Sequence, residues 1–157
     1  MMTNTCPICS AQNEEILLQT PNLRVIAVHN EANAPAFCRV IWQNHVAEMT
    51  DLSAAQRHEI MDMVYRVEVA MREVLQPSKI NLASLGNVVP HLHWHVIARF
   101  ADDACFPAPI WANPVREHGF RLPDNWINQA SVGWATCCPR GLTQPYFSGC
   151  LKAHFNH

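Results

Sequence analysis

The sequence predicts a domain of the α+β class, in which antiparallel β-strands are covered by one long helix. Two segments rich in β-branched residues, 23–28 and 37–42, lie on either side of a turn-forming stretch and favour a β-hairpin. Apolar residues in the segment 53–76 repeat at the spacing of an amphipathic helix that covers a sheet. The chain of 157 residues suits a single domain with its own hydrophobic core.

The composition excludes several classes of protein. Apolar residues make up 49% of the chain and charged residues 15%, which excludes a disordered chain. A net charge of -2 without any basic run argues against nucleic-acid binding. The polar start and the charges throughout the long helix predict neither a signal peptide nor a membrane-spanning segment. We therefore expect a cytoplasmic protein without nucleic-acid or membrane partners.

A C-x-x-C motif, Cys6 to Cys9, opens the chain. The total of seven cysteines is odd, which argues against a complete disulfide framework. Two thiols at this spacing suit tetrahedral Zn²⁺, but a second pair of ligands is needed to close such a site. The motif alone leaves a metal site and ordinary thiols both open. The apolar residues 16–18 that follow indicate the start of a short helix or strand.

Local signals delimit the hairpin and the helix. Residues 29–35 have the composition of a turn, so the flanking strands are expected to pair antiparallel across a long connection. Ser53 and Gln56 form a capping-box pattern at the start of the helix, and Pro77 ends it. The apolar stripe of this helix, which we expect to face the core, consists of Ile60, Met63 or Val64, Val67, Ala70 or Met71, and Val74.

A row of three histidines follows the helix. A third strand, 80–84, and a turn at 85–90 lead into the segment 91–100, which is expected to pair back on the third strand. His91, His93 and His95 alternate with apolar residues, so their side chains share one face of a strand.

The chain changes character after the histidine strand. The segment that follows Phe100 is broken by prolines, and all periodicity stops near Gln129. We therefore expect one domain at 1–128 and a C-terminal tail, 129–157, to which no secondary structure is assigned.

Three imidazoles on one face allow two kinds of chemistry. A purely structural row is disfavoured, because each buried ring nitrogen needs a partner. In one interpretation the histidines hold a hydrolytic Zn²⁺. In the other, a neutral histidine attacks an electrophilic phosphorus and a neighbour donates a proton to the departing oxygen. Gly86 and Asn87 supply a turn that can hold phosphate oxygens, and Asn81 lies on the strand leading in.

The row His91-Leu92-His93-Trp94-His95-Val96-Ile97 resembles the His-φ-His-φ-His-φ-φ signature, with φ apolar, of the histidine triad (HIT) family of nucleotide hydrolases and transferases. The approach from Asn81 to Asn87, the exit at Arg99, the hairpin and the helix are also similar to that family. The resemblance covers about residues 5–111 and is greatest to the bacterial branch related to diadenosine polyphosphate hydrolases. It implies the family's α+β fold, an antiparallel sheet with one long helix packed on it, and a homodimer.

The resemblance also implies a reaction and the residues that perform it. The reaction is attack on the α-phosphate of a nucleotide derivative, such as a dinucleoside polyphosphate or a nucleoside phosphoramidate. His93 would form a nucleotidyl-histidine, and His95 would contact the scissile phosphate and help the leaving group. The residues implied in substrate binding are Asn81, Gly86 and Asn87 at the phosphate, and His29 and Asn30 near the ribose.

Some members of the superfamily bind zinc through an N-terminal C-x-x-C, a histidine after the hairpin and the first triad histidine. Cys6, Cys9, His45 and His91 match these four positions. The resemblance therefore implies a structural Cys₂His₂ zinc site and no organic cofactor. It also assigns His91 to the metal and leaves the other two triad histidines for the substrate.

Two of the departures from the family pattern lie just before the triad. Asn87 stands where glutamine is common, and Val88 stands where a small residue with a hydroxyl is common, which removes potential phosphate contacts. These departures favour, as an alternative, a non-catalytic nucleotide-binding module with the same fold. A metal-dependent hydrolase that uses all three triad histidines is the remaining alternative.

Overall fold

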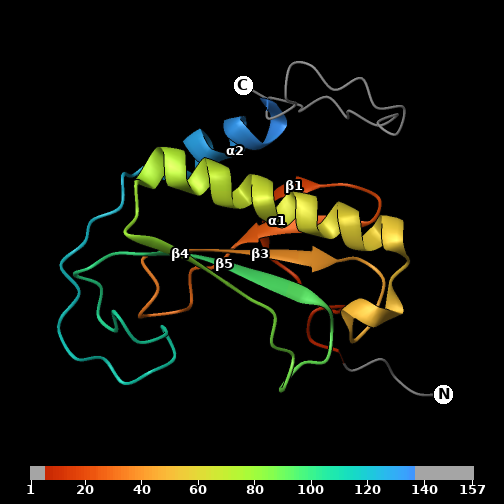
Figure 1. The fold of residues 1–157 in the computed structure, drawn as a ribbon, viewed down its shortest axis with the longest axis horizontal. Helices are drawn as coiled ribbons and strands as arrows, with labels where there is room; N and C mark the ends of the chain where they lie inside the picture. Colours follow the sequence, from red (N-terminus) through yellow and green to blue (C-terminus); the bar gives the residue numbers. More distant parts are fainter. Residues whose placement is uncertain (1–5, 137–157) are drawn as a thin grey trace.

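The computed structural model describes residues 6–136 and confirms the α+β fold, with one five-stranded antiparallel sheet and a long helix (Figure 1). The strand order is β1-β2-β3-β5-β4. The sheet consists of β1 (Glu15–Gln19), β2 (Leu23–Ala27), β3 (Ala36–Trp42), β4 (Lys79–Ala83) and β5 (His93–Arg99). The helices are the 3₁₀ helix η1 (Met49–Asp51), the long α1 (Ala54–Leu75) and α2 (Trp126–Thr136).

The expected hairpin and the histidine strand pair as their patterns indicate. β2 and β3 are antiparallel neighbours, and β5 pairs with both β3 and β4. In the β3–β5 register Arg39 lies opposite His95, and Ile41 lies opposite His93. The segment around residues 16–18, for which a helix and a strand were both open, is the edge strand β1. The histidine strand therefore lies inside the sheet, with a neighbour on each side.

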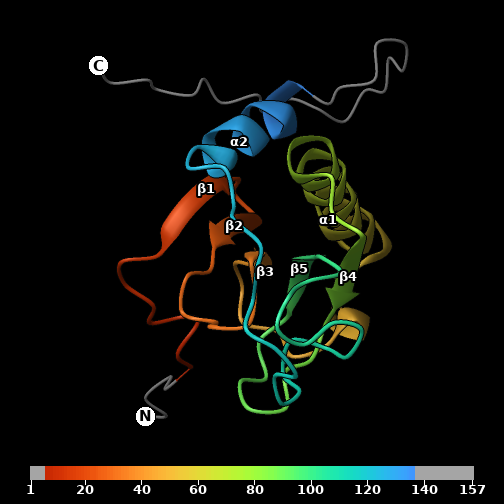
Figure 2. The ribbon, with the colours of Figure 1, turned by 90° about the vertical axis from the view of Figure 1, so that its left-hand side faces the viewer.

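The two faces of the sheet have different chemistry because successive strand side chains point to opposite faces. One face is apolar and packs against α1 (Figure 2). Val25, Val40 and Val96 on this face are fully buried. The opposite face carries His93 and His95 on β5 and Arg39 on β3. One strand pattern thus supplies both the hydrophobic core and the histidine row.

Helix α1 begins and ends at the predicted signals. The Ser53 hydroxyl accepts a hydrogen bond from the Gln56 amide, and the Gln56 side chain accepts one from the Ser53 amide. Gln76 takes the left-handed conformation, with φ of 45°, at the C-terminus, and Pro77 follows it. The predicted core stripe is buried at Ile60, Met63, Val64, Val67, Ala70 and Met71, whereas Val74 is partly buried.

Strand β5 begins at His93, two residues later than the pattern suggests. The amide of His91 donates to the carbonyl of Val89 in the preceding turn, which takes that residue out of the strand ladder. Leu92 donates to the carbonyl of Val46 and accepts from the amide of Trp42. His91 consequently lies at the entrance to the strand, close to the end of the hairpin.

Helix α2 crosses residue 128, where the sequence marks the end of the periodic chain. Trp126 and Ala130 are buried against the core, and a Cβ built on Gly133 would lie 3.3 Å from the Ala70 Cβ on α1. Trp126, Ala130 and Gly133 are four and three residues apart, so they form one stripe on α2. Because two of the three side chains are small, this stripe is only a weak sequence signal for an amphipathic helix. The division of the chain at 128/129 stays a prediction, and residues 137–157 lie outside the described part.

None of the helices within residues 6–136 is both long enough and apolar enough to cross a membrane.

Candidate functional site

His93 and His95 lie side by side on β5 and are buried, with 7% and 4% of their surfaces exposed. Their rings meet edge to face at a centroid separation of 4.7 Å. The strand alternation predicted this arrangement, since residues two apart share a face. The pair therefore presents two imidazoles to one small volume on the face opposite α1.

A backbone hydrogen bond determines which nitrogen of His93 is reactive. The Nδ1–H of His93 donates to the carbonyl oxygen of His91 at 2.6 Å. Nε2 then carries the lone pair, because a neutral imidazole has one N–H and one acceptor nitrogen. Burial lowers the pKa of His93, with Arg39 acting in the same direction. His93 is thus held as a neutral imidazole with Nε2 available as a nucleophile.

His95 is also neutral at ordinary pH. Burial lowers its pKa to about 3, and the neighbouring His93 and Arg39 act in the same direction. Its Nδ1 is buried and has no hydrogen-bond partner among the described residues. A buried ring nitrogen without a partner is uncommon in native proteins, so Nδ1 is a candidate contact for a bound group. The site can therefore offer a hydrogen bond from His95 to a bound group.

His91 is oriented differently from the other two histidines. Its Nε2–H donates to the carbonyl oxygen of Trp42 at 2.6 Å. Its Nδ1 faces three potential metal ligands, at 3.5 Å from Cys6 Sγ, 3.3 Å from Cys9 Sγ and 3.3 Å from His45 Nδ1. A metal-ligating histidine usually donates its second N–H to a carbonyl or carboxylate, as His91 does here.

The separations among these four ligand atoms fit one zinc ion. Zn–S bonds of about 2.3 Å and Zn–N bonds of about 2.0–2.1 Å place sulfur and nitrogen about 3.5 Å apart at the corners of a tetrahedron, and two nitrogens about 3.3 Å apart. Three of the four sulfur–nitrogen separations are 3.3–3.5 Å, and the two nitrogens are 3.3 Å apart. All four atoms lie within 4.8 Å of one another. The donor set and its geometry therefore suit tetrahedral Zn²⁺.

Sequence reasoning missed the residues that surround His95. The Phe37 ring lies 5.2 Å from the His95 ring, and the Trp111 ring lies 5.5 Å away, edge to face. The Arg39 guanidinium lies over the Phe37 ring, 5.2 Å from its centroid. A charged residue within an otherwise apolar strand is the one sequence signal that could have singled out Arg39. Trp111 comes from a proline-broken loop whose path local patterns do not predict.

Comparison with known proteins agrees with this geometry. The family model of the HIT domain matches residues 10–102, which is more than half of the chain. The chain belongs to the HIT domain family. Proteins of this family generally bind or hydrolyse nucleotides. No curated protein matches the sequence significantly.

Solved HIT structures share the fold of this domain. A histidine triad protein from Bradyrhizobium japonicum is 29% identical, with a TM-score of 0.62 over 76% of this chain and 90% of its own. A Zn-bound histidine triad family protein from Mycobacterium smegmatis is 17% identical, with a TM-score of 0.56 over 83% of this chain and 94% of its own. A hypothetical histidine triad nucleotide-binding protein from Sulfolobus tokodaii is 13% identical, with a TM-score of 0.55 over 82% of this chain and 85% of its own.

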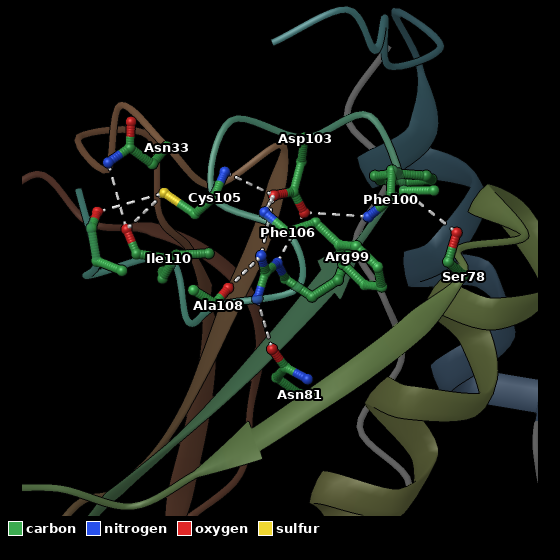
Figure 3. A network of polar contacts seen from close by, with 12 residues as sticks. Asn33, Ser78, Asn81, Arg99, Phe100, Asp103, Cys105, Phe106, Ala108 and Ile110 are labelled. Carbon is green, nitrogen blue, oxygen red and sulfur yellow. Dashed lines mark hydrogen bonds and ion pairs between the residues drawn. The ribbon is translucent and has the colours of Figure 1, made fainter. Parts of the chain in front are cut away.

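In this HIT domain Asn81 belongs to a buried polar network (Figure 3). Its side-chain oxygen accepts a hydrogen bond from Arg99 at 2.8 Å. Arg99 also forms a two-point ion pair with Asp103, at 2.7 and 2.9 Å, and donates to the carbonyl of Ala108. This pairing lowers the pKa of Asp103 against the opposing effect of burial. The side chain of Asn81 is thereby oriented on the same sheet face as the histidines.

The loop before β5 carries the expected glycine turn. Gly86 has φ of 96°, a left-handed conformation that glycine adopts without steric penalty. Asn87 is exposed, and Val88 is 92% exposed at the loop tip. The hydroxyl of Ser84, which sequence reasoning did not single out, donates to the His93 carbonyl at 2.9 Å. This loop is therefore tied to the reactive strand through a backbone contact.

The residues expected near a ribose lie just beyond the end of β2. Both His29 and Asn30 are exposed. His29 Nε2 contacts the carboxylate of Glu15 on β1. A substrate that used His29 would have to share or displace this contact.

Proposed function

We propose that this HIT domain is a nucleotide hydrolase or nucleotidyl transferase that uses His93 as a covalent nucleophile. The observation that carries the proposal is the hydrogen bond from Nδ1–H of His93 to a backbone carbonyl, which leaves Nε2 unprotonated. The centroids of the His93 and His95 rings are 4.7 Å apart. Nε2 would attack the α-phosphorus and form a P–N bond, while the P–O or P–N bond to the leaving group breaks and the leaving group takes its electron pair. Water would then attack the nucleotidyl-histidine, giving a nucleoside monophosphate and restoring His93.

The other residues act on the phosphate or the nucleoside in this proposal. His95 is neutral because its pKa is about 3, so it would act as a hydrogen-bond donor to the scissile phosphate and leaving group. Gly86 and Asn87 supply the turn beside the phosphate, and Asn81 orients the leaving group. His29 and Asn30, beyond the end of β2, would lie near the ribose. The substrates we propose are a dinucleoside polyphosphate or a nucleoside phosphoramidate.

We also propose that zinc binds to Cys6, Cys9, His45 and His91 as a structural ion. The support is the tetrahedral spacing of the four ligand atoms, together with the printed description of the Mycobacterium smegmatis relative as Zn-bound. When bound, zinc would hold the first residues of the chain to the end of the hairpin and the start of β5. Four protein ligands leave no open position, so these residues would hold zinc without placing it in the reaction.

A homodimer is part of the proposal. Strand β4 is an edge of the sheet, with unpaired backbone groups on one side. Leu82 on this strand is 40% exposed, and Tyr65 on α1 is 63% exposed. A hollow lined in part by Glu68 of α1, Leu82 of β4 and Trp111 lies along this edge. A second copy of the chain would cover both the edge and these apolar side chains.

We further place the protein in the cytoplasm, where the C-x-x-C thiols stay reduced.

Replacement of the nucleophile tests the reaction. We expect His93→Ala to lose at least about 10³-fold in turnover of diadenosine tetraphosphate, because water alone cannot replace the positioned nucleophile. Acid-free quenching of the wild type should trap a phosphorus-bonded histidine, located at His93 by mass spectrometry, and the variant should give no adduct. Full turnover by a folded His93→Ala protein would refute the covalent mechanism.

A non-catalytic nucleotide-binding module is the second candidate. The exposed Val88 offers no hydroxyl to the phosphate, which favours binding without reaction. Tight AMP binding by the wild type, with neither turnover nor adduct across polyphosphates, phosphoramidates and nucleotide sugars, would select this candidate.

The geometry disfavours a hydrolase with metal on all three histidines. The cluster of metal-binding groups within residues 6–136 includes His91 but neither His93 nor His95.

A further inference from the structure

We propose that Arg39 binds the phosphate group of the substrate beside His95. The inference rests on the proposed function in one respect, namely that the ligand is a nucleotide. It adds a fixed positive charge to a site that otherwise consists of neutral imidazoles and amides. The family signature does not include Arg39, because it lies on a different strand and more than fifty residues earlier in the chain.

The position of Arg39 in the sheet places it next to the reactive pair. Arg39 on β3 lies directly opposite His95 on β5. Cβ atoms of directly opposite strand residues are about 4.5–5.5 Å apart and point to the same face. The guanidinium stacks over the ring of Phe37, which also contacts the His95 ring. Phe37 thus holds both side chains at one side of the site.

Arg39 lacks the partner that other arginines of the sheet have. Arg24 pairs with Glu14 at 2.7 Å, and Arg99 pairs with Asp103 at 2.7 Å. Within the described residues no carboxylate lies within ion-pair distance of Arg39, and its buried Nε–H has no acceptor. Glu31 and Glu14 act on Arg39 only at longer range. A guanidinium is never deprotonated in proteins, so Arg39 keeps its positive charge without a direct ion pair among the described residues.

Two polar atoms without partners therefore lie on opposite residues of adjacent strands. They are Nε of Arg39 and Nδ1 of His95. Buried polar groups without partners destabilise a protein by about 1–3 kcal/mol each, so a functional reason is expected where two occur together. An acceptor oxygen with negative charge would satisfy Arg39 and accept a hydrogen bond from a neutral His95. Phosphate supplies several such oxygens, and a guanidinium binds phosphate with more than one N–H.

The same charge would assist the reaction. When Nε2 of His93 attacks the α-phosphorus, negative charge has to be stabilised on the nonbridging oxygens of the group that is transferred. A preorganised guanidinium next to His95 stabilises that charge more strongly in a buried site than in water. An unpaired, half-buried arginine is by contrast unfavourable for the free protein. A residue kept for substrate binding is therefore expected to lower stability slightly.

Substitution of Arg39 separates phosphate binding from the other contacts. We expect Arg39→Met to weaken AMP binding by about 10- to 100-fold in calorimetry, whereas adenosine binding changes less than about twofold. Arg39→Lys keeps the charge but not the planar fork, so its AMP affinity should lie between the two. In single-turnover assays with diadenosine tetraphosphate, Arg39→Met should lower kcat/KM by about 10²-fold. Its thermal stability should equal or exceed that of the wild type.

The control variant is Arg66→Met, which removes one positive charge from α1, on the other side of the sheet, where Arg66 pairs with Asp62. It should bind AMP like the wild type. Equal losses for AMP and adenosine in Arg39→Met would show that Arg39 acts on the nucleoside rather than on the phosphate, and unchanged AMP binding would show no role; either result overturns the proposal. The absence of AMP binding by the wild type would overturn it as well. If only the His93 adduct is missing, the covalent mechanism fails while the Arg39 proposal still holds.

Discussion

At the scale of single residues, the three triad histidines have different chemistry because their ring nitrogens have different partners. His91 donates from Nε2 to the Trp42 carbonyl, whereas His93 donates from Nδ1 to the His91 carbonyl. His95 has no partner on Nδ1 among the described residues. These hydrogen bonds turn the His91 ring toward Cys6, Cys9 and His45, whereas the His93 and His95 rings face the proposed substrate site.

His95 makes stability depend on pH. The unfolded His95 binds a proton near pH 6.5, but the folded one does so only near its pKa of about 3. The unfolded state therefore binds more protons between these values, and folding stability falls as pH falls through this window. The loss is at most about 1.4 kcal/mol for each pH unit below 6.5.

Urea unfolding at pH 7.5 and pH 5.0 measures this dependence. Compared with His95→Gln, which cannot titrate, the wild type should lose about 2 kcal/mol more between these two values. Ionisable groups that do not contact His95 titrate alike in the two proteins and cancel in the comparison. Equal losses in wild type and variant would contradict the assignment of this pKa shift to His95.

At the scale of elements, the C-x-x-C segment joins β3 and β5 through one ligand cluster. Cys6 and His91 are 85 residues apart in the sequence, and His45 follows the hairpin. Between Cys6 and the start of β1, the described residues form turns and no strand or helix. Arg24 donates to the carbonyl of Ile8 at 3.0 Å and is one contact that holds this segment. We infer that a metal on the ligand cluster would be the second.

Zinc content tests this connection. The purified wild type should contain one zinc per chain, and Cys9→Ser should lose it and unfold at a lower temperature, because a structural zinc contributes folding free energy directly. His93→Ala and Cys105→Ser should each retain one zinc, since neither residue belongs to the cluster. Retention of zinc by Cys9→Ser together with its loss from His93→Ala would instead place the metal on the histidine row.

At the scale of the whole molecule, the exposed edge of β4 predicts self-association. Leu82 lies on this edge strand and Tyr65 on the neighbouring helix α1, and both are too exposed to serve the core of one chain. We expect sedimentation velocity to give a dimer for the wild type and a monomer for Leu82→Glu, because a buried carboxylate without a partner opposes association. Val115→Glu, at an exposed loop position, is the matched control and should stay dimeric. A wild type that sediments as a monomer at micromolar concentration would contradict this expectation.

Local patterns predicted those features that depend on neighbours along the chain. The alternation around His93 and His95 places both on one face, and the Ser53–Gln56 capping box marks the helix start to the residue. Each depends on backbone geometry over a few residues, which the adjacent sequence specifies. The triad motif added the family, because its spacing is specific. The short helix α2 was not predicted, because its small residues form only a weak apolar stripe.

The strand faces, the long helix, the histidine row and the resemblance to the family all follow from residues that are near one another in the chain. Which distant groups meet depends on how the strands pair and how the loops close. The register between β3 and β5 places Arg39 opposite His95, and the path of the chain after β5 brings Trp111 to the same ring. Arg99 joins Asn81 to Asp103 in the same way. Such contacts depend on strand pairing and loop closure, which involve residues far apart in the chain, so no local pattern contains them.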